Sequence, residues 1–259
     1  MHNEIITIGP FTIYGYGLMI AIGIIAAFLV GEYRAKKQSL NPDMIFSLVI
    51  WCVISGFLGS KILYTITILD KVMADPSILL KFADGWVVYG GIIGGIIGGF
   101  LCCKFHKVDF IAYFDLVMPS VALAQGFGRI GCLLAGCCYG KETDSAFHII
   151  FHSSAYAPND VALVPTQIIS SVCDFALFIL LIIIASKVKR RGFIAGIYLV
   201  LYSIGRFILE FYRGDLIRGS VGSLSTSQFI GLFTALAGVI IIIWALKNRQ
   251  SENTDDTIM

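Results

Sequence analysis

The sequence predicts an all-α integral membrane protein with about seven transmembrane helices. Hydrophobic residues make up 57% of its 259 residues and charged residues 14%, whereas soluble globular chains average about 45–50% apolar and about 25% charged. The mean hydropathy is +0.85, and apolar runs long enough to cross a bilayer recur along the chain. This composition excludes a disordered protein and disfavours a water-soluble enzyme. The net charge of +2 is too small to indicate binding to nucleic acid.

Each apolar run is expected to be a helix, because a backbone surrounded by lipid must satisfy its own hydrogen bonds. The first run should be a true span, since the segment before it lacks the basic start of a cleaved signal peptide. The connections are short except for an outer loop at 140–165, so we expect a single integral membrane domain over 1–259. The expected spans are 11–31, 44–68, 86–103, 110–136, 166–186, 193–212 and 226–246.

The distribution of Lys and Arg predicts that the N-terminus lies outside and the C-terminus inside. Loops on the cytoplasmic side of membrane proteins are enriched in these residues. The connections after the first, third, fifth and seventh spans hold many more of them than the connections on the opposite side. The inner set is Arg34, Lys36, Lys37, Lys104, Lys107, Lys187, Lys189, Arg190, Arg191, Lys247 and Arg249, and the outer set is Lys71, Lys81, Lys141, Arg213 and Arg218.

Small residues have a packing interpretation in most of the chain. The glycine-rich run at 90–99 places small residues at four-residue spacing, which favours close contact between membrane helices. A phosphate-binding loop is disfavoured there, because no Lys-Ser/Thr pair follows. The seven cysteines lie in or beside apolar runs and are interpreted mainly as small apolar residues. For Cys132, Cys137 and Cys138 a disulfide or a metal site is the alternative.

Charges inside the apolar runs are the strongest pointers to function. A buried cation costs about 2.5–3.5 kcal/mol on insertion scales and needs a partner or a wet cavity. Arg206, Glu210 and Arg213 have the spacing of one helix face, which is compatible with a ladder of ion pairs, whereas Arg129 has no acid within a turn. Arginines facing a common cavity suit a phosphate group, so a phospholipid enzyme, a phospholipid transporter and an anion channel are all open. The charged residues in or at the edge of the runs are Lys61, Arg129, Arg206, Asp115, Asp174 and Glu210.

Several motifs occur together, in an order typical of one enzyme family. The most specific are Gly128–Gly140, which begins Gly-Arg-Ile-Gly-Cys, and Arg206–Arg213, which reads Arg-Phe-Ile-Leu-Glu-Phe-Tyr-Arg. Over nearly the whole chain these motifs resemble those of prolipoprotein diacylglyceryl transferases, whose seven-span topology with an outer N-terminus also agrees. The further matching segments are Tyr14–Met19, Gly59–Tyr64, Tyr89–Gly94, Pro165–Gln167 and Ser225–Gln228.

The resemblance implies transfer of a diacylglyceryl group from phosphatidylglycerol to the lipobox cysteine thiol of a prolipoprotein, with release of glycerol phosphate. Such a protein would be a multi-pass protein of the bacterial plasma (inner) membrane, with membrane lipids but no nucleic acid as partners and with no metal or organic cofactor. The thiol must react as a thiolate, and the departing phosphate needs preorganised positive groups.

The resemblance also implies roles for particular residues. Arg129 would bind phosphate, Arg206 would lie near the leaving group, and Glu210 would orient Arg206 or Arg213. With Tyr89, these make up the expected catalytic residues Arg129, Arg206, Tyr89 and Glu210. The expected substrate contacts are Arg129, Tyr16, Lys61, Gly90, Gly91, Gly128, Gly140, Gln167, Arg213 and Gln228, with hydrogen bonding in the core an equal interpretation for the two glutamines.

Four positions depart from the family pattern. A tyrosine hydroxyl ionises well above neutral pH and is a poor resting base, although Tyr89 can still act through its hydroxyl. The loop residues His148 and His152 are substitutes for a base, but such histidines are usually solvated. The departures leave open a related transferase with another acceptor and, less favoured because no internal repeat is visible, an anion or lipid transporter. They are Tyr89 for a histidine, Lys61 for an arginine, Cys132 for an asparagine and Cys137 for an acid.

Overall fold

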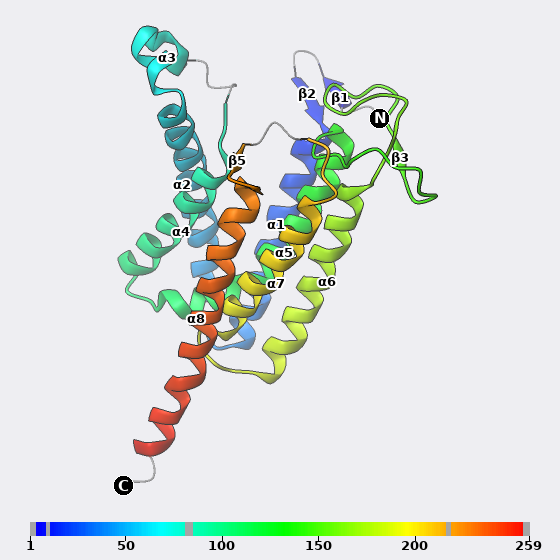
Figure 1. Cartoon of the computed structure of the whole chain (residues 1–259). Helices are drawn as coiled ribbons and strands as arrows, with labels where there is room; N and C mark the ends of the chain where they lie inside the picture. The colour runs from blue at the N-terminus through cyan, green and yellow to red at the C-terminus, as the bar shows by residue number, and fades with distance from the viewer. Residues whose placement is uncertain (1–3, 9–10, 81–84, 216–218, 256–259) are drawn as a thin grey trace. The chain divides into compact units, whose positions relative to one another are not determined.

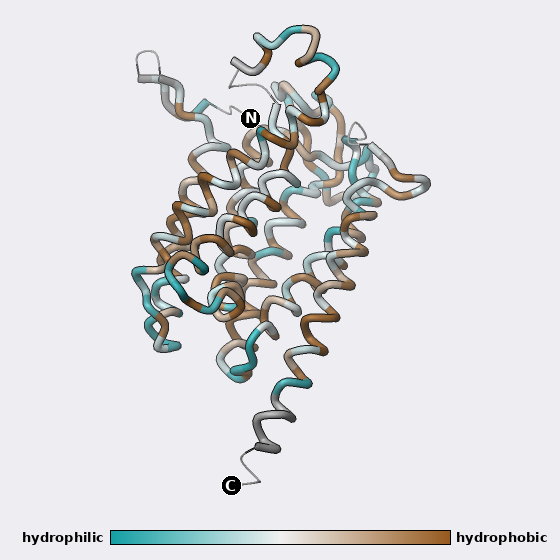
Figure 2. The backbone as a smooth tube through the Cα atoms, turned by 90° about the vertical axis from the view of Figure 1, so that its left-hand side faces the viewer, coloured by the Kyte–Doolittle hydropathy of each residue, from teal (hydrophilic) through white to brown (hydrophobic). Residues whose placement is uncertain are grey.

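The computed structural model describes residues 4–8, 11–80, 85–215 and 219–255 (Figure 1). Seven of the described helices are long and apolar enough to cross a membrane, which confirms the expected all-α, multi-pass membrane protein. Figure 2 shows apolar residues along the length of these helices. They are α1 (Gly15–Lys37), α2 (Asp43–Thr67), α4 (Val88–Phe105), α5 (Phe110–Ala135), α6 (Thr166–Lys187), α7 (Phe193–Glu210) and α8 (Thr226–Asp255).

The largest error in the expected spans is at the N-terminus. Phe11–Tyr14 is strand β2, paired antiparallel with β1 (Glu4–Ile8), and is not the start of a helix. Its aromatic and β-branched residues favour an extended backbone. Helix α1 begins at Gly15 and continues to Lys37, beyond the expected end, so basic residues assigned to a connection lie in its last turn. Cations in that position interact favourably with the helix dipole.

The other differences concern where helices end. Helix α7 ends at Glu210 rather than at residue 212, and α8 continues to Asp255. Two of the cations that predict the orientation, Lys81 and Arg218, lie outside the described residues, and the orientation of the termini stays a prediction. The shorter elements are α3 (Leu69–Ala74), the 3-10 helix η1 (Pro76–Leu80), β3 (Ile149–Ile150), β4 (Ala162–Leu163), β5 (Ser220–Val221) and β6 (Leu224–Ser225).

The chain packs as two compact units, and the single domain expected from the sequence stays a prediction. One unit is Gly31–Tyr113, and the other combines Met1–Val30 with Phe114–Met259. In the first unit α2 packs on α4 through small residues. A side chain added at Gly90 would collide with the backbone of Gly59. The glycine-rich run therefore packs helices together, as its spacing predicts.

In the second unit, α7 packs against both α6 and α8 (Figure 1). A core of Met118, Ala122 and aliphatic residues of α6 and α7 fills the space between α5 and these helices. The intramembrane acid Asp115 of α5 accepts a hydrogen bond of 2.7 Å from the backbone N–H of Ala195. This bond satisfies a donor in the first turn of α7, where a carboxylate is also favoured by the helix dipole. Asp115 therefore has a structural role.

The loop at 140–165, expected on the outer side, has its own small core. Strands β3 and β4 pair antiparallel, and the fully buried Phe151 packs with Ala157 and Leu163. Gly140 forms an isolated bridge with Arg213. The loop is therefore tied to the turn that follows α7.

Candidate active site

The signature segment begins with a helix C-cap at the end of α5. The N–H of Cys137 donates to the carbonyl oxygen of Cys132 at 3.1 Å, and the N–H of Gly136 donates to that of Leu133 at 3.2 Å. These two bonds define a Schellman motif. Gly136 has φ +74°, a left-handed conformation that glycine adopts without steric cost. The reversal brings Cys137 back beside Cys132 on the last turn of the helix.

The start of α6 holds the backbone of this segment. Thr166 Oγ1 donates to the carbonyl oxygen of Cys138, and Gln167 Nε2 donates to that of Cys137, both at 2.9 Å. Thr166 and Gln167 are each only 1% exposed. The amide nitrogen of Gln167 thus makes a core hydrogen bond, the structural one of its two expected roles. Its Oε1 is buried and has no hydrogen-bond partner among the described residues.

Three thiols gather at this turn. The sulfur atoms of Cys132, Cys137 and Cys138 all lie within 4.8 Å of one another, and all three residues are free cysteines. Hydrogen bonds from the thiols of Cys132 and Cys137, together with the neighbouring Arg213, lower the pKa of the Cys138 thiol below its usual value. Hydrogen bonding to Cys132 and Cys138 raises the pKa of the Cys137 thiol.

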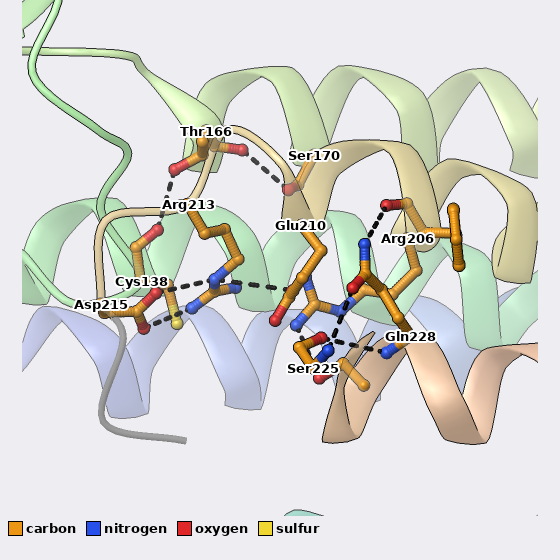
Figure 3. Close-up of polar contacts among 11 residues, drawn as sticks. Cys138, Thr166, Ser170, Arg206, Glu210, Arg213, Asp215, Ser225 and Gln228 are labelled. Atoms are coloured by element: carbon orange, nitrogen blue, oxygen red, sulfur yellow. Dashed lines mark hydrogen bonds and ion pairs between the residues drawn. The ribbon is translucent and has the colours of Figure 1, made fainter. Parts of the chain in front are cut away.

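A row of alternating charges runs along the last turns of α7 and into the turn after it (Figure 3). Arg206 Nη1 lies 2.7 Å from Glu210 Oε2, and Arg206 Nη2 donates to Ser227 Oγ at 3.1 Å. Arg213 Nε lies 4.0 Å from the same Glu210 oxygen and donates to Asp215 Oδ1 at 2.8 Å. The side chains of Arg206 and Glu210 are only 13% and 10% exposed. The ion-pair ladder expected from the sequence therefore exists, and Asp215 extends it.

One detail of that expectation is wrong. The i, i+4, i+7 spacing predicts that Arg213 lies on the same helix face as Arg206, but α7 ends at Glu210. Arg213 lies in the following turn and reaches Glu210 from there. It is 4% exposed, and its bridge to Gly140 fixes the turn.

Arg129 differs from the other two arginines. It lies near the end of α5, and its electrostatic neighbours include Tyr202, Cys132 and Asp174. Within the described part of the chain, no carboxylate oxygen lies within 4.0 Å of its guanidinium group. Its fork of donors is therefore available for an anion. A side chain at Gly128 would meet open space, so the neighbouring backbone leaves room.

Asp174 is a member of this group that the sequence-based candidates omit. It lies on α6, is 6% exposed, and its Oδ2 is buried without a hydrogen-bond partner among the described residues. Arg129 and Arg206 both exert an electrostatic influence on it. The sequence could have indicated Asp174, because an acid in the middle of an apolar span generally marks a functional position.

Tyr16 of α1 lies beside the same turn of α5. A side chain added at Gly131 would lie 3.2 Å from the Tyr16 ring, and the cysteine group and Arg129 are the electrostatic neighbours of its hydroxyl. Tyr16 remains 42% exposed. The structure thus brings Tyr16, Arg129 and the signature turn together, and the expected contact of Tyr16 with substrate stays a prediction.

Two other residues expected to contact substrate also make structural contacts. Gln228 forms a capping box with Ser225: the N–H of Ser225 donates to Gln228 Oε1 at 3.0 Å, and the N–H of Gln228 donates to Ser225 Oγ at 3.1 Å. Gly140 packs against Val164, and a side chain there would collide with the Val164 backbone. Their predicted contact with substrate stays a prediction.

The remaining candidates belong to the unit Gly31–Tyr113. Lys61 Nζ lies over two aromatic rings, 5.4 Å from the centroid of Tyr64 and 5.3 Å from that of Trp86. Tyr89 is partly buried in the first turn of α4. Gly90 and Gly91 face small residues of α2. Whether these residues share a site with the arginines stays a prediction.

The loop histidines are poor candidates for a catalytic base. His148 and His152 are both exposed. Nδ1 of His148 lies 2.7 Å from the carbonyl oxygen of Ser145, and Nδ1 of His152 lies 2.8 Å from Asp160. Both rings therefore interact within the outer loop.

An apolar groove of about 440 Å³ lies beside the charged row. It is formed by α6, α7 and the outer loop, and Gly205, Ile208 and Tyr212 are among its lining residues. Tyr212 immediately precedes Arg213. The groove therefore runs along the helix that also carries Arg206 and Glu210.

Comparison with known proteins identifies the family. The family model for prolipoprotein diacylglyceryl transferases matches residues 3–244. A Clostridium perfringens protein named phosphatidylglycerol–prolipoprotein diacylglyceryl transferase 2 is 51% identical over 240 residues, which cover 92% of this chain and 93% of that protein. A Clostridium tetani protein named phosphatidylglycerol–prolipoprotein diacylglyceryl transferase is 48% identical over 229 residues, or 88% of this chain and 92% of that protein. A second Clostridium perfringens protein, numbered 1, is 32% identical over 249 residues, or 94% of both chains. The chain belongs to the prolipoprotein diacylglyceryl transferase family.

Proposed function

We propose that this protein transfers the diacylglyceryl group of phosphatidylglycerol to the lipobox cysteine of a prolipoprotein. The thiolate sulfur attacks the glyceryl carbon, a C–S bond forms, and the C–O bond to phosphate breaks. Glycerol phosphate leaves with the bonding electrons. The protein works as a single domain in the bacterial plasma (inner) membrane, with its N-terminus outside.

The observation that supports this most directly is the contrast among the arginines. Arg206 is paired with Glu210, and Arg213 is bonded to Asp215. Arg129 has no such carboxylate partner among the described residues. A guanidinium fork matches phosphate oxygens, and burial cannot neutralise it. We assign the phosphate of the lipid to Arg129, and Arg206 stabilises the charge that develops as glycerol phosphate departs.

The paired carboxylates act as positioning groups. Glu210 contacts both Arg206 and Arg213, so it holds two cations at the positions where the phosphate must leave. Asp174 influences Arg129 and Arg206 from α6. Without these acids, three clustered cations would repel one another, and each would carry the cost of burial alone.

Lys61 and Tyr89 are assigned contacts with the acceptor thiol, and they lie where α2 meets the start of α4. Ser60 Oγ donates to the carbonyl oxygen of Val87 at 2.9 Å, and the N–H of Val87 lies 3.4 Å from the carbonyl oxygen of Ser60. Lys61 and Tyr89 follow these two residues closely in sequence. The Tyr89 hydroxyl would hydrogen-bond the thiol, and Lys61 would favour its thiolate.

The test uses the full-length protein in vesicles that contain phosphatidylglycerol, with a lipobox peptide as acceptor. Mass spectrometry follows the peptide, and a coupled assay follows glycerol phosphate. Arg129→Ala should abolish both products, while Arg190→Ala, outside the site, should retain the wild-type rate. A peptide with Cys→Ser should give no product. Normal lipidation by Arg129→Ala would contradict the assignment of the phosphate.

A second candidate is a transferase with the same lipid donor and another acceptor. Clostridium perfringens has two proteins of this name, and this chain is 51% identical to one and 32% identical to the other. The chain also departs from the family pattern at Tyr89, Cys132 and Cys137. Release of glycerol phosphate without modification of the lipobox peptide would favour this candidate.

A further inference from the structure

The thiol group at the end of α5 has no part in the reaction described above. Cys137 and Cys138 follow Cys132 by five and six residues, and the helix reversal at Gly136 brings the three sulfur atoms within 4.8 Å of one another. We propose that Cys132, Cys137 and Cys138 form a binding site for one thiophilic metal ion, of the class of Zn²⁺, Cd²⁺ and Cu⁺. Soft thiolate ligands select these ions over Mg²⁺ or Ca²⁺.

The geometry of the sulfur atoms suits such an ion. The centre of an equilateral triangle with edges of 4.8 Å lies about 2.8 Å from each corner, and a Zn–S bond is about 2.3 Å long. Each sulfur would therefore have to move inward by at most about 0.5 Å, which a small χ1 rotation achieves without moving the backbone. A three-sulfur site leaves a position open for a further ligand.

The backbone that carries the ligands is already fixed. Cys132 is in the last turn of α5 and is 8% exposed. The carbonyl groups of Cys137 and Cys138 are held by Gln167 and Thr166 at 2.9 Å. A site on an ordered backbone loses little conformational entropy when it binds an ion.

The surroundings offset the charge of the loaded site. Three thiolates around a divalent ion have a net charge of −1, and buried negative charge requires a nearby cation. Arg129 and Arg213 are both electrostatic neighbours of Cys138. These arginines therefore supply the nearby positive charge that a buried metal–thiolate site requires.

The experiment uses the full-length protein, purified in detergent under reducing, anaerobic conditions and stripped with a chelator. It is titrated with Cd²⁺, whose bonds to thiolates give an ultraviolet charge-transfer band. One ion per chain should bind, and Zn²⁺ should displace it. Cys137→Ser and Cys138→Ser should each weaken binding by about tenfold or more, whereas Cys173→Ser, on the exposed face of α6, should bind as the wild type does.

A second measurement covers variants that fail to fold. In the wild-type protein, Cd²⁺ should protect Cys132, Cys137 and Cys138 from alkylation and leave Cys173 reactive. Absence of a charge-transfer band, unchanged binding by Cys137→Ser, or a disulfide among the three cysteines in the reduced protein would each overturn the proposal. These readouts do not involve lipid transfer, so they are independent of the proposed function.

Discussion

Glu210→Gln should reduce the rate of diacylglyceryl transfer by about a hundredfold. The substitution keeps the shape of the side chain and removes the charge that lies 2.7 Å from Arg206 Nη1. Both side chains are largely buried, at 13% and 10% exposure, so solvent screens the pair weakly. Removing one partner of a buried pair costs about 3–5 kcal/mol. At about 1.4 kcal/mol per tenfold, the lower value corresponds to about two orders of magnitude if it appears in the transition state.

The contacts around Glu210 predict the order of transfer activity among the variants of this site. Arg206 keeps its hydrogen bond to Ser227 in Glu210→Gln, and Arg213 keeps Asp215, so the loss should be smaller than that caused by Arg206→Ala. Ser227→Ala removes one hydrogen bond to a charged group, worth about 1.5–3 kcal/mol, and should cost about tenfold in rate. The expected order of activity is wild type, Ser227→Ala, Glu210→Gln and Arg206→Ala.

The assay measures initial rates of peptide lipidation in vesicles with phosphatidylglycerol, and thermal unfolding of each variant in detergent. Lys189→Ala, on an exposed connection, is the control for insertion. A Glu210→Gln variant that keeps more than half of the wild-type rate, or a Ser227→Ala variant slower than Glu210→Gln, would contradict the role assigned to the ion pair. A loss of activity matched by an equal loss of folded protein would also refute it, because the charge would then act through stability.

Three further predictions follow from the structure. Gly136→Ala should destabilise the protein by about 1–2 kcal/mol, because alanine disfavours the left-handed backbone and a methyl group would also collide with Ser154; thermal unfolding of Gly128→Ala, where the added methyl group meets open space, is the comparison. Gly205→Phe should fill the apolar groove and raise KM for a lipid or peptide substrate more than it lowers kcat, since its side chain meets no backbone on leaving α7; an unchanged KM would show that the groove is not used. A reporter fused to the C-terminus should be active only on the cytoplasmic side, as the Lys and Arg distribution requires, and activity outside would reverse the assigned orientation.

Hydropathy predicts the helical architecture because the bilayer imposes a length and a composition on every span. It cannot distinguish a short apolar strand from the first turn of a helix, so Phe11–Tyr14 is placed in α1 although it pairs with β1. Spacing likewise predicts the contact of Arg206 with Glu210 but misplaces Arg213, because a 3.6-residue period says nothing about where the helix ends. The end of α7 depends on the turn that bridges to Gly140.

In the candidate site, too, the sequence predicts some features, while others depend on how the chain packs. The single charges inside apolar spans are visible in the sequence because their cost is a property of each residue. The contacts of those charges are not visible, since Asp215 pairs with Arg213 through the turn after α7 and Asp174 influences the arginines through the packing of α6. The thiol group is also hidden, because Cys132 and Cys137 are brought together by the conformation of Gly136 rather than by a CxxC spacing.

Cys132 and Cys137 lie on a turn that is held by its backbone. Its hydrogen bonds join backbone groups to one another and to the side chains of Thr166 and Gln167. The thiols of the two cysteines hydrogen-bond to Cys138 and take no part in the bonds that hold the backbone, so the backbone of the turn is fixed without them. Cys137→Ser should therefore unfold at nearly the wild-type temperature, whereas Gln167→Ala, which leaves a buried carbonyl group unsatisfied, should lose about 1–3 kcal/mol. Because hydrogen bonds of its backbone hold this turn, residues of different chemistry can occupy its side-chain positions without changing its conformation. The turn can therefore carry a group of thiols beside Arg129.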